Sequence, residues 1–403
     1  MTQRCIALLG VGHTNAHIVK QWATQPMPSC RLVCISKFPT ATYSGMLPGT
    51  LAGQFTTEEM QIDLRSLANK ANAELMLAEV TGLDTQRQML HFSNAEPLHF
   101  DVLSVGVGSM PAGCRELDSE SVVPIKPMQT FLPRLDERLD FAAGNGGQSV
   151  NVAIVGGGVA GIEIALCLRA RVAEKFSDRQ VSIQIFTSSD DIGDGLRKRS
   201  VRLLRRLLSK RGIHVITNCR VTGAADGNVV TSDGSCFAAD CVIWSTGAVA
   251  PPVLASLGLP TDDRGFLATD RTLQTTAGQP IFAVGDSGTV VQDPSPKSGV
   301  YAVRQAPVLW HNLQATLDGK PLQEFHAQRD FLKILNTGDG KALLEYKGFS
   351  IHARWCMKLK TWIDKRFIAP YQIDAPTFAA HGNFAQATPL YRHQQPDANA
   401  PAG

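Results

Sequence analysis

Short apolar runs that break into glycine recur along this chain. Residues 5–9, Cys-Ile-Ala-Leu-Leu, run into Gly10, and residues 152–155, Val-Ala-Ile-Val, run into Gly156. A continuous apolar run of this length, bounded by turn residues, is typical of a strand buried on both faces of a parallel sheet. A helical pattern follows each glycine cluster. The sequence therefore predicts the same event twice, a strand, a glycine turn and a helix.

The elements predicted after the two glycine turns also correspond. The first half has the pattern of a helix, a strand, a turn-rich loop and a further strand, over residues 15–23, 31–36, 39–53 and 100–105. The second half has the pattern of a helix, a strand, a basic helix, a strand, a hairpin and a strand, over residues 161–175, 181–186, 195–210, 212–216, 229–237 and 240–244. Both final strands run into glycine and then proline, which indicates that the whole unit is duplicated. We therefore expect an α/β fold with two Rossmann-like domains.

Later elements complete the first unit and add a small C-terminal region. A strand over 280–283 ends in Gly285 and Asp286, and a helix is predicted over 299–316. Residues rich in Pro, Ala, Gln and Asn at the C-terminus predict a disordered tail. The expected division is a first domain from 1–113 and 248–318, a second domain from 114–247, a C-terminal interface region from 319–372 and the tail from 373–403.

Composition narrows the class of protein. The chain has 403 residues, of which 44% are hydrophobic and 19% charged, as in ordinary globular proteins. A net charge of +3 is too small to favour nucleic acid as a partner. No apolar run reaches about 20 residues, the length of a membrane span, and the chain begins almost directly on a strand, which leaves no room for a signal peptide. The nine cysteines lie mostly in apolar runs, as reduced core cysteines do, so we expect a cytoplasmic protein.

The glycines of each cluster predict contacts with the phosphates of a dinucleotide. Gly10 and Gly156 are placed to make the tight turn from strand to helix, and Gly12 and Gly158 let the backbone approach a pyrophosphate with no Cβ in the way. The helix that follows presents free N–H groups and the positive end of its dipole. Two such sites in one chain suggest electron transfer between two dinucleotides. The alternative is that either cluster is only a tight turn.

Two further features of the clusters bear on the ligand. Gly161 allows the second helix to pack closely on its strand, and Ala16 takes this place in the first copy. An acidic or basic residue at the end of the second strand normally meets the adenosine ribose, but the first copy has Ser36 there and the second has Thr187. The basic run at 197–199 either meets a 2′-phosphate or is the solvated face of an amphipathic helix. NADH and NADPH both stay open.

Gly285 and Asp286 form a third glycine element at the end of a strand. A carboxylate at such a position can accept hydrogen bonds from the ribityl hydroxyls of a flavin, while the next helix points its N-terminus at the ring. Read alone, Gly-Asp-Ser-Gly is an ordinary turn. In order after the two clusters, it predicts a flavin contact.

The order of these motifs resembles the pyridine nucleotide-disulfide oxidoreductases, the flavoproteins that bind two dinucleotides. The resemblance rests on the first cluster, on 156–163 (Gly-Gly-Gly-Val-Ala-Gly-Ile-Glu), on Trp-Ser-Thr-Gly at 244–247 and on Ala-Val-Gly-Asp at 283–286, and it covers about residues 3–315. Residues 43–49 and 296–305 look most like the flavoproteins fused to selenide, water dikinase, which are similar to type II NADH dehydrogenases. The resemblance implies FAD in the first domain, NAD(P)H in the second, and hydride transfer from nicotinamide to flavin.

The motifs and the resemblance together predict the site residues. Glu163 stands where the family places a carboxylate near the nicotinamide and flavin. Lys297 precedes the helix expected to face the flavin, where a cation can stabilise negative charge on the reduced ring. A solvated helix start and a solvated loop are the alternative interpretations, and no metal site is expected. The residues expected to bind cofactors are Gly10, Gly12, Ala16, Ser36, Gly108, Gly156, Gly158, Gly161, Gly247, Gly285, Asp286 and Gly299.

The electron acceptor is less well defined. Disulfide reductases carry a Cys-x4-Cys pair in the flavin domain, but residues 38–60 contain no cysteine. The one match, Cys236 and Cys241, would lie about 16 Å apart on an extended chain, too far for a disulfide, so both are interpreted as structural. The Ala-Gln-x-Ala-x-Gln pattern of type II dehydrogenases is absent at 299–304, which reads Gly-Val-Tyr-Ala-Val-Arg. A quinone, a selenium or sulfur species, and a flavin-bound redox sensor with little turnover all stay open.

A basic, aromatic stretch near the C-terminus suggests a partner. Apolar residues recur there at helical spacing, with Lys and Arg between them: Trp355, Leu359, Trp362, Ile363 and Phe367. Such a helix can lie in a membrane interface, and it resembles the membrane-docking region of type II dehydrogenases. This predicts peripheral contact of residues 354–367 with the inner face of the cell membrane. The alternative is a helix packed on the flavin domain or on a second copy in a homodimer.

Overall fold

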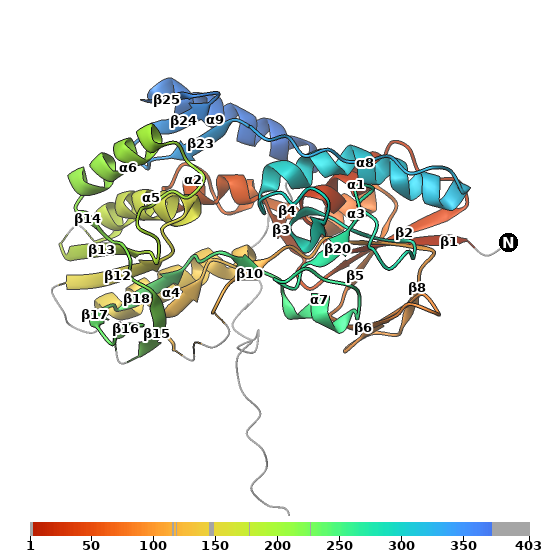
Figure 1. Cartoon of the computed structure of the whole chain (residues 1–403), viewed down its shortest axis with the longest axis horizontal. Helices are drawn as coiled ribbons and strands as arrows, with labels where there is room; N and C mark the ends of the chain where they lie inside the picture. The colour runs from red at the N-terminus through yellow and green to blue at the C-terminus, as the bar shows by residue number, and fades with distance from the viewer. Residues whose placement is uncertain are drawn as a thin grey trace, which may run out of the picture.

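Two parallel sheets of the same design lie side by side in the computed structural model, which describes residues 3–114, 117, 119–144, 149–176, 178–225 and 227–372 (Figure 1). Each sheet has five strands, and the central strand of each leads into a glycine cluster. The predicted α/β fold with two Rossmann-like domains is confirmed.

The first sheet has the order β21-β9-β1-β2-β5, and every pairing is parallel. Ile6, Ala7 and Leu8 of the central strand are fully buried, because a parallel sheet of this kind is covered by helices on both faces. Its strands are β1 (Arg4–Leu9), β2 (Cys30–Ser36), β5 (Glu74–Leu77), β9 (Val102–Val105) and β21 (Ile281–Ala283).

The second sheet repeats this arrangement with the order β11-β18-β12-β13-β14, again all parallel. Its glycine strand lies between the next strand of the chain and the strand that returns after an antiparallel insertion, as β1 does in the first sheet. The predicted duplication is therefore confirmed by strand order. The strands are β11 (Val122–Pro124), β12 (Ser149–Val155), β13 (Gln180–Phe186), β14 (Ile213–Ile216) and β18 (Cys241–Trp244).

Antiparallel strands occupy matching places in the two halves. The three-stranded sheet β6-β7-β8 precedes β9, and β15-β16-β17 precedes β18. The hairpin predicted over 229–237 is formed by β16 and β17. A two-stranded ribbon of β10 (Met110–Pro111) and β19 (Ala248–Val249) joins the halves. The bounds of the insertions are β6 (Val80–Asp84), β7 (Met89–Phe92), β8 (Leu98–His99), β15 (Val221–Ala225), β16 (Asn228–Thr231) and β17 (Cys236–Ala238).

The first half carries the helices α1 (His13–Trp22), α3 (Leu64–Lys70) and α8 (Gly299–Asp318), and the second carries α4 (Phe131–Gly144), α5 (Val159–Lys175) and α6 (Lys198–Lys210). Helices α1, α5, α6 and α8 lie close to where the sequence predicts them, whereas α3 and α4 were not predicted. Leu204 and Leu208 of α6 are buried while its basic residues face outward, so the interpretation of this stretch as an amphipathic helix is confirmed. The predicted limits of the domains themselves stay predictions.

The segment 39–53, predicted as a turn-rich loop, contains regular structure. Strand β3 (Thr40–Thr42) pairs with β4 (Gln61–Asp63), and the short helix α2 (Leu47–Leu51) follows. The helix forms because Pro48 favours a helix start and both Leu47 and Leu51 are buried. Helix α2 packs against α5 and so lies between the two halves.

The C-terminal region is a three-stranded antiparallel sheet followed by one helix. Strands β23 (Lys333–Asn336), β24 (Ala342–Tyr346) and β25 (Phe349–Ala353) lead into α9 (Arg354–Ile368). Figure 1 shows α9 above α2, where it extends from the second half toward the first. The tail predicted over 373–403 lies outside the described residues.

No disulfide joins any of the nine cysteines, all of which are described. Cys236 is exposed at the start of β17 and Cys241 is buried at the start of β18, so the interpretation of this pair as separate thiols is confirmed. Among the described helices, none is long and apolar enough to span a bilayer.

Gly161→Ala tests the close packing of α5 on the second sheet. A Cβ at Gly161 would overlap the carbonyl oxygen of Gly156, so α5 must move away from β12. We expect a loss of about 3 kcal/mol in the free energy of unfolding, measured by urea denaturation. Gly158→Ala is the matched control, because a Cβ there meets nothing within 4 Å and the backbone has an ordinary negative φ. Equal stability of the two variants would contradict the packing role.

Candidate active site

The first glycine cluster is a turn that only glycine can make. Gly10 has a φ of +80°, and a Cβ there would lie 2.6 Å from the carbonyl oxygen of Gly106. The side-chain amide of Asn15 holds the turn by donating to the carbonyl of Gly10 at 2.7 Å. Gly12 then precedes α1, whose start has no side-chain cap, so the first N–H groups of the helix are left for a ligand.

The predicted flavin-binding residues come together at the carboxyl ends of β9 and β21. The Gly108 N–H donates to Ser287 Oγ at 2.8 Å, and the Gly285 N–H donates to Gln305 Oε1 of α8 at 2.6 Å. Helix α8 starts at Gly299, again with no side-chain cap. The structure thus brings Gly10, Gly12, Gly108, Gly285, Asp286 and Gly299 to one end of the first sheet.

Asp286 is held in its charged form at this place. Its Oδ2 accepts hydrogen bonds from Ser109 Oγ at 2.6 Å and from Lys126 Nζ at 3.3 Å. Burial alone would raise the pKa of Asp286, but the Lys126 ammonium and the Ser109 hydroxyl hold it below its usual value. Lys126 follows β11 of the second sheet, so this ion pair also joins the two halves.

The second glycine cluster has the same geometry at the end of β12. Gly156 has a φ of +122°, and a Cβ there would overlap the carbonyl group of Ser245, one residue beyond β18. Gly158 precedes α5, which also starts without a side-chain cap. Gly247 lies just beyond β18, where its carbonyl accepts from Ala112 N–H at 2.8 Å. The Ser245 hydroxyl is buried and has no hydrogen-bond partner among the described residues.

Glu163 lies in the first turns of α5 and faces the C-terminal region. Its Oε1 accepts a hydrogen bond from the Asn336 N–H at 2.6 Å. Burial raises the pKa of Glu163 to about 7, although the Lys360 ammonium acts to lower it. A carboxyl group with this pKa exchanges a proton at neutral pH.

Lys360 of α9 is the buried cation beside Glu163. Its Nζ donates to Asp364 Oδ2 at 3.0 Å and to the Gly45 carbonyl at 2.8 Å. Burial alone would lower the pKa of Lys360, but the carboxylates of Glu163 and Asp364 raise it. Asp364 Oδ1 in turn accepts from the Tyr43 hydroxyl at 3.2 Å. Glu163, Lys360, Asp364 and Tyr43 form one run of polar groups, here called the polar chain, in which Lys360 and Asp364 are buried and the other two are partly buried.

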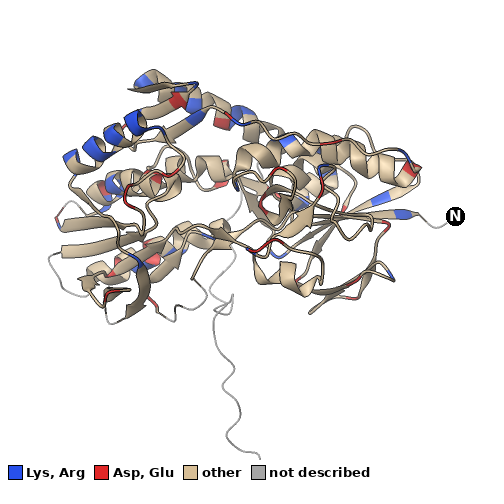
Figure 2. Ribbon diagram, in the orientation of Figure 1, with Lys and Arg blue, Asp and Glu red and all other residues tan. Residues whose placement is uncertain are grey.

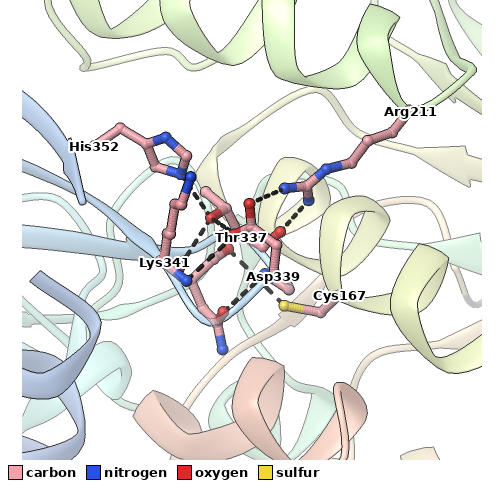
Figure 3. A network of polar contacts seen from close by, with 8 residues as sticks. Cys167, Arg211, Thr337, Asp339, Lys341 and His352 are labelled. Carbon is pink, nitrogen blue, oxygen red and sulfur yellow. Dashed lines mark hydrogen bonds and ion pairs between the residues drawn. The ribbon is translucent and has the colours of Figure 1, made fainter. Parts of the chain in front are cut away.

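The turn between β23 and β24 is held in place by a network of polar contacts (Figure 3). Arg211 at the end of α6 binds Asp339 at 2.8 Å and the carbonyl of Thr337, and Thr337 Oγ1 lies 2.9 Å from His352 Nε2. Gly338 is required here, because a Cβ would lie 2.5 Å from the carbonyl oxygen of Leu166 in α5. The turn is therefore locked on α5 and presents the Asn336 N–H to Glu163.

The remaining predicted residues lie outside these contacts. Lys297 Nζ donates to the Gly288 carbonyl at 2.6 Å and to Thr289 Oγ1 at 2.8 Å, and it lies 4.0 Å from the ring centroid of Phe266. Its ammonium is thus occupied by strand β22 (Gly288–Val290). Ser36 bonds the carbonyl of Phe38 at 2.7 Å, and Ala16 is buried in α1. The functional roles proposed for these three residues stay predictions.

Four polar residues at the site were not predicted from the sequence. Lys126 lies between a strand and Pro127, Lys360 and Asp364 have i, i+4 helical spacing, and Tyr43 lies within the predicted loop. Only the Lys360–Asp364 spacing is a readable signal, since opposite charges four residues apart pair on a helix. Even that spacing does not reveal that the pair is buried.

A family model described as pyridine nucleotide-disulphide oxidoreductase matches residues 6–306. The chain belongs to this family. It is 22% identical to the NADH dehydrogenase-like protein YutJ of Bacillus subtilis, over 84% of this chain and 90% of that one. It is 27% identical to the demethylphylloquinone reductase NdbB of Synechocystis, over 67% and 69% of the two chains.

Solved structures of similar fold include a sulfide:quinone oxidoreductase and an NDH2. The sulfide:quinone oxidoreductase of Aquifex aeolicus matches with a TM-score of 0.76 at 19% identity, over 93% of each chain. NDH2 of Plasmodium falciparum in complex with NADH matches with a TM-score of 0.74 at 13% identity, over 91% of this chain and 98% of that one. At these identities, the comparison shows a shared fold.

Family membership makes the chain an oxidoreductase that uses FAD and NAD(P)H. The described residues fit these cofactors. Three helices begin without a side-chain cap beside glycines that leave the backbone open, which suits phosphate groups. The charged Asp286 can accept hydrogen bonds from ribityl hydroxyls. The buried Ser245 hydroxyl has no partner among the described residues, and a bound ligand can provide one.

Glu163→Gln tests the raised pKa of the carboxyl group. The pKa of Glu163 is about 7 in the folded chain and 4.5 in the unfolded chain. Ionisation of Glu163 therefore lowers the free energy of unfolding progressively as the pH rises from 4.5 to 7. Glutamine has no such cost. We expect the free energy of unfolding of the variant, relative to wild type, to increase from pH 5 to pH 8 in urea denaturation. Glu174→Gln, an exposed change on the same helix, is the control, and the same offset at both pH values for Glu163→Gln would contradict the assignment.

Proposed function

We propose that the chain is an NAD(P)H dehydrogenase that passes electrons to a quinone-type acceptor. The observation that carries this proposal is what surrounds the first glycine cluster. Disulfide reductases have two cysteines in this part of the flavin domain. In this chain, residues 38–60 contain no cysteine and include Tyr43, the end of the polar chain. Cys356, the cysteine of α9, is buried against β24 and β25 and donates to the Ile351 carbonyl. Neither residues 38–60 nor Cys356 therefore supports a thiol relay to a sulfur or selenium acceptor, and this favours direct reduction of a planar organic acceptor.

The two glycine clusters divide the cofactors between them. We assign NAD(P)H to the cluster at Gly156 and Gly158, and FAD to the cluster at Gly10 and Gly12, with Asp286 on the ribityl chain. Bound FAD supplies the two-electron chemistry that links the nicotinamide to the acceptor. The protein's contribution is to hold the two nucleotides at facing sheet ends and to control protons.

The polar chain supports a route for the proton that the reaction needs. Reduction of a quinone by NAD(P)H takes a hydride from the nicotinamide and one proton from solvent, and gives NAD(P)⁺ and quinol. Glu163 can hold that proton at neutral pH, because its pKa is about 7. Lys360 and Asp364 connect it to the Tyr43 hydroxyl beside the first glycine cluster. We assign proton delivery to these groups.

A surface of the C-terminal region suits a membrane. Phe349, Ile351, Trp355 and Trp362 are exposed on β25 and α9, with exposed fractions from 42% to 70%. Basic residues of α6 and α9 lie along the same edge of the molecule (Figure 2). Exposed aromatic residues within a basic surface are typical of contact with anionic lipid. We call these four residues the docking face and propose that it binds the inner face of the cell membrane.

The redox proposal is tested with purified protein loaded with FAD. Under argon, NADH or NADPH should bleach the flavin absorbance near ~450 nm, because hydride passes to the bound flavin. A water-soluble quinone should then restore the absorbance in stopped-flow mixing, and selenium or sulfur compounds should not. Absence of bleaching by both nucleotides would defeat the dehydrogenase assignment. Reoxidation by sulfur or selenium species alone would replace the quinone as acceptor.

Gly158→Ala tests the assignment of NAD(P)H to the second cluster. The new Cβ occupies open space in the free protein but stands where the backbone must approach a pyrophosphate. We expect the dissociation constant of NAD(P)H to increase by about tenfold, the equivalent of one lost hydrogen bond, with FAD content unchanged. The constant is obtained from the dependence of the rate of flavin bleaching on NAD(P)H concentration in stopped-flow mixing. Loss of FAD with unchanged NAD(P)H binding would reverse the assignment of the two clusters.

The double variant Trp355→Ser, Trp362→Ser tests the docking face. Removing two exposed indoles should lower flotation with vesicles of phosphatidylglycerol and phosphatidylcholine by at least about tenfold. Phe141→Ser is the matched control, since Phe141 is 53% exposed on α4, outside the docking face. Flotation unaffected by the tryptophan changes would remove the docking face as the membrane contact.

A further inference from the structure

A histidine stands inside the first glycine cluster. His13 is the first residue of α1, directly after Gly12. Its Nε2 is buried and has no hydrogen-bond partner among the described residues. Leaving a buried polar atom unsatisfied costs about 1–3 kcal/mol, so such an atom in a native site needs an explanation. A ligand is one.

The buried Nε2 atom lies close to the start of α8. A Cβ added at Gly299, the first residue of α8, would lie 3.8 Å from His13 Nε2 and 3.8 Å from Ser44 Oγ. Gly299 therefore brings the uncapped start of α8 close to both polar atoms.

Two aromatic rings from distant parts of the chain flank the imidazole. The His13 ring lies 5.4 Å from Tyr43, edge to face, and 5.7 Å from Phe367 of α9. Tyr43 and Phe367 stack on each other at 4.3 Å. The cluster offers flat apolar walls beside one polar atom, which suits a planar ring that carries a carbonyl group.

The charge state of the imidazole fits a carbonyl rather than an anion. Burial lowers the pKa of His13 to about 4, with Lys126 adding to this and Asp286 opposing it. At pH 7 the ring is neutral and carries one N–H, which it can donate to an oxygen atom. Tyr43, which touches the imidazole, is also the end of the polar chain.

We propose that His13 binds the electron acceptor, with Nε2 donating to a carbonyl oxygen of a quinone-type ring that packs beside Tyr43 and Phe367. This assignment rests on the proposed function and makes His13 a determinant of acceptor specificity. It places the acceptor's oxygen and the last group of the polar chain on the same side of the first glycine cluster. An acceptor with no carbonyl group has no use for this hydrogen bond.

His13→Phe is the test, because phenylalanine keeps a planar ring and has no N–H to donate. His17→Phe, one turn further along α1, is the matched control. We expect the KM for a water-soluble quinone and its dissociation constant from the oxidised holoenzyme, measured by flavin fluorescence quenching, to increase about threefold to tenfold, as for one lost hydrogen bond. FAD content, the flavin spectrum, the rate of bleaching by NAD(P)H and the reduction of ferricyanide should stay as in wild type. His17→Phe should change none of these.

Three outcomes would overturn the proposal. Unchanged quinone binding and KM in His13→Phe would mean that the imidazole does not touch the acceptor. Loss of FAD, or a shifted flavin spectrum, would mean that it bonds the cofactor instead. If wild type bleaches with NAD(P)H but no quinone reoxidises it, the proposed acceptor class fails, and the proposal for His13 fails with it.

Discussion

The ammonium group of Lys360 is the interaction on which the site depends. It is buried, and it is shared among Asp364 on its own helix, Glu163 of α5 and the carbonyl of Gly45 ahead of α2. A buried charge with one partner removed costs about 3–5 kcal/mol, so none of these groups can move alone. Through this one group, the C-terminal helix, the second glycine cluster and the loop beside the first cluster are held in register.

The turn 336–341 binds Glu163, the carboxylate that lies beside Lys360. Asn336 donates its N–H to Glu163 and its side-chain amide to Gln54, which follows α2. One residue therefore contacts groups from both halves of the molecule. The C-terminal sheet thus connects the two halves at the site, although it belongs to neither of the duplicated units.

The sequence is informative where a local rule decides the structure. The central strands β1 and β12, the turns at Gly10 and Gly156 and the helices after them follow from apolar runs and from glycine geometry, and these were predicted. The parallel strands β5 and β11 at the sheet edges were not. Helix α2 was missed because its five residues carry no periodic pattern, and only burial of Leu47 and Leu51 stabilises it. Its neighbour Tyr43 gave no signal, since its partner Asp364 is more than 300 residues away.

Helix α9 was predicted, but its orientation was not. Its apolar residues suggested one face, yet the chain buries Lys360 and Asp364 and exposes Trp355 and Trp362. A polar pair is buried here because Glu163 and Gly45 lie opposite it, a fact that no pattern within the helix contains. Long-range contacts of this kind decide the chemistry of the site, and they lie beyond the reach of periodicity.

The two faces of α9 have a consequence for how substrate arrives. Trp362 on the docking face and Phe367 beside His13 are five residues apart, or about 7.5 Å along the helix axis. A hydrophobic acceptor dissolved in lipid would then need to travel only about the depth of a headgroup to reach the imidazole. For a protein docked in this way, the supply of acceptor depends on its mole fraction in the bilayer. The search for substrate becomes a problem of lateral diffusion in two dimensions.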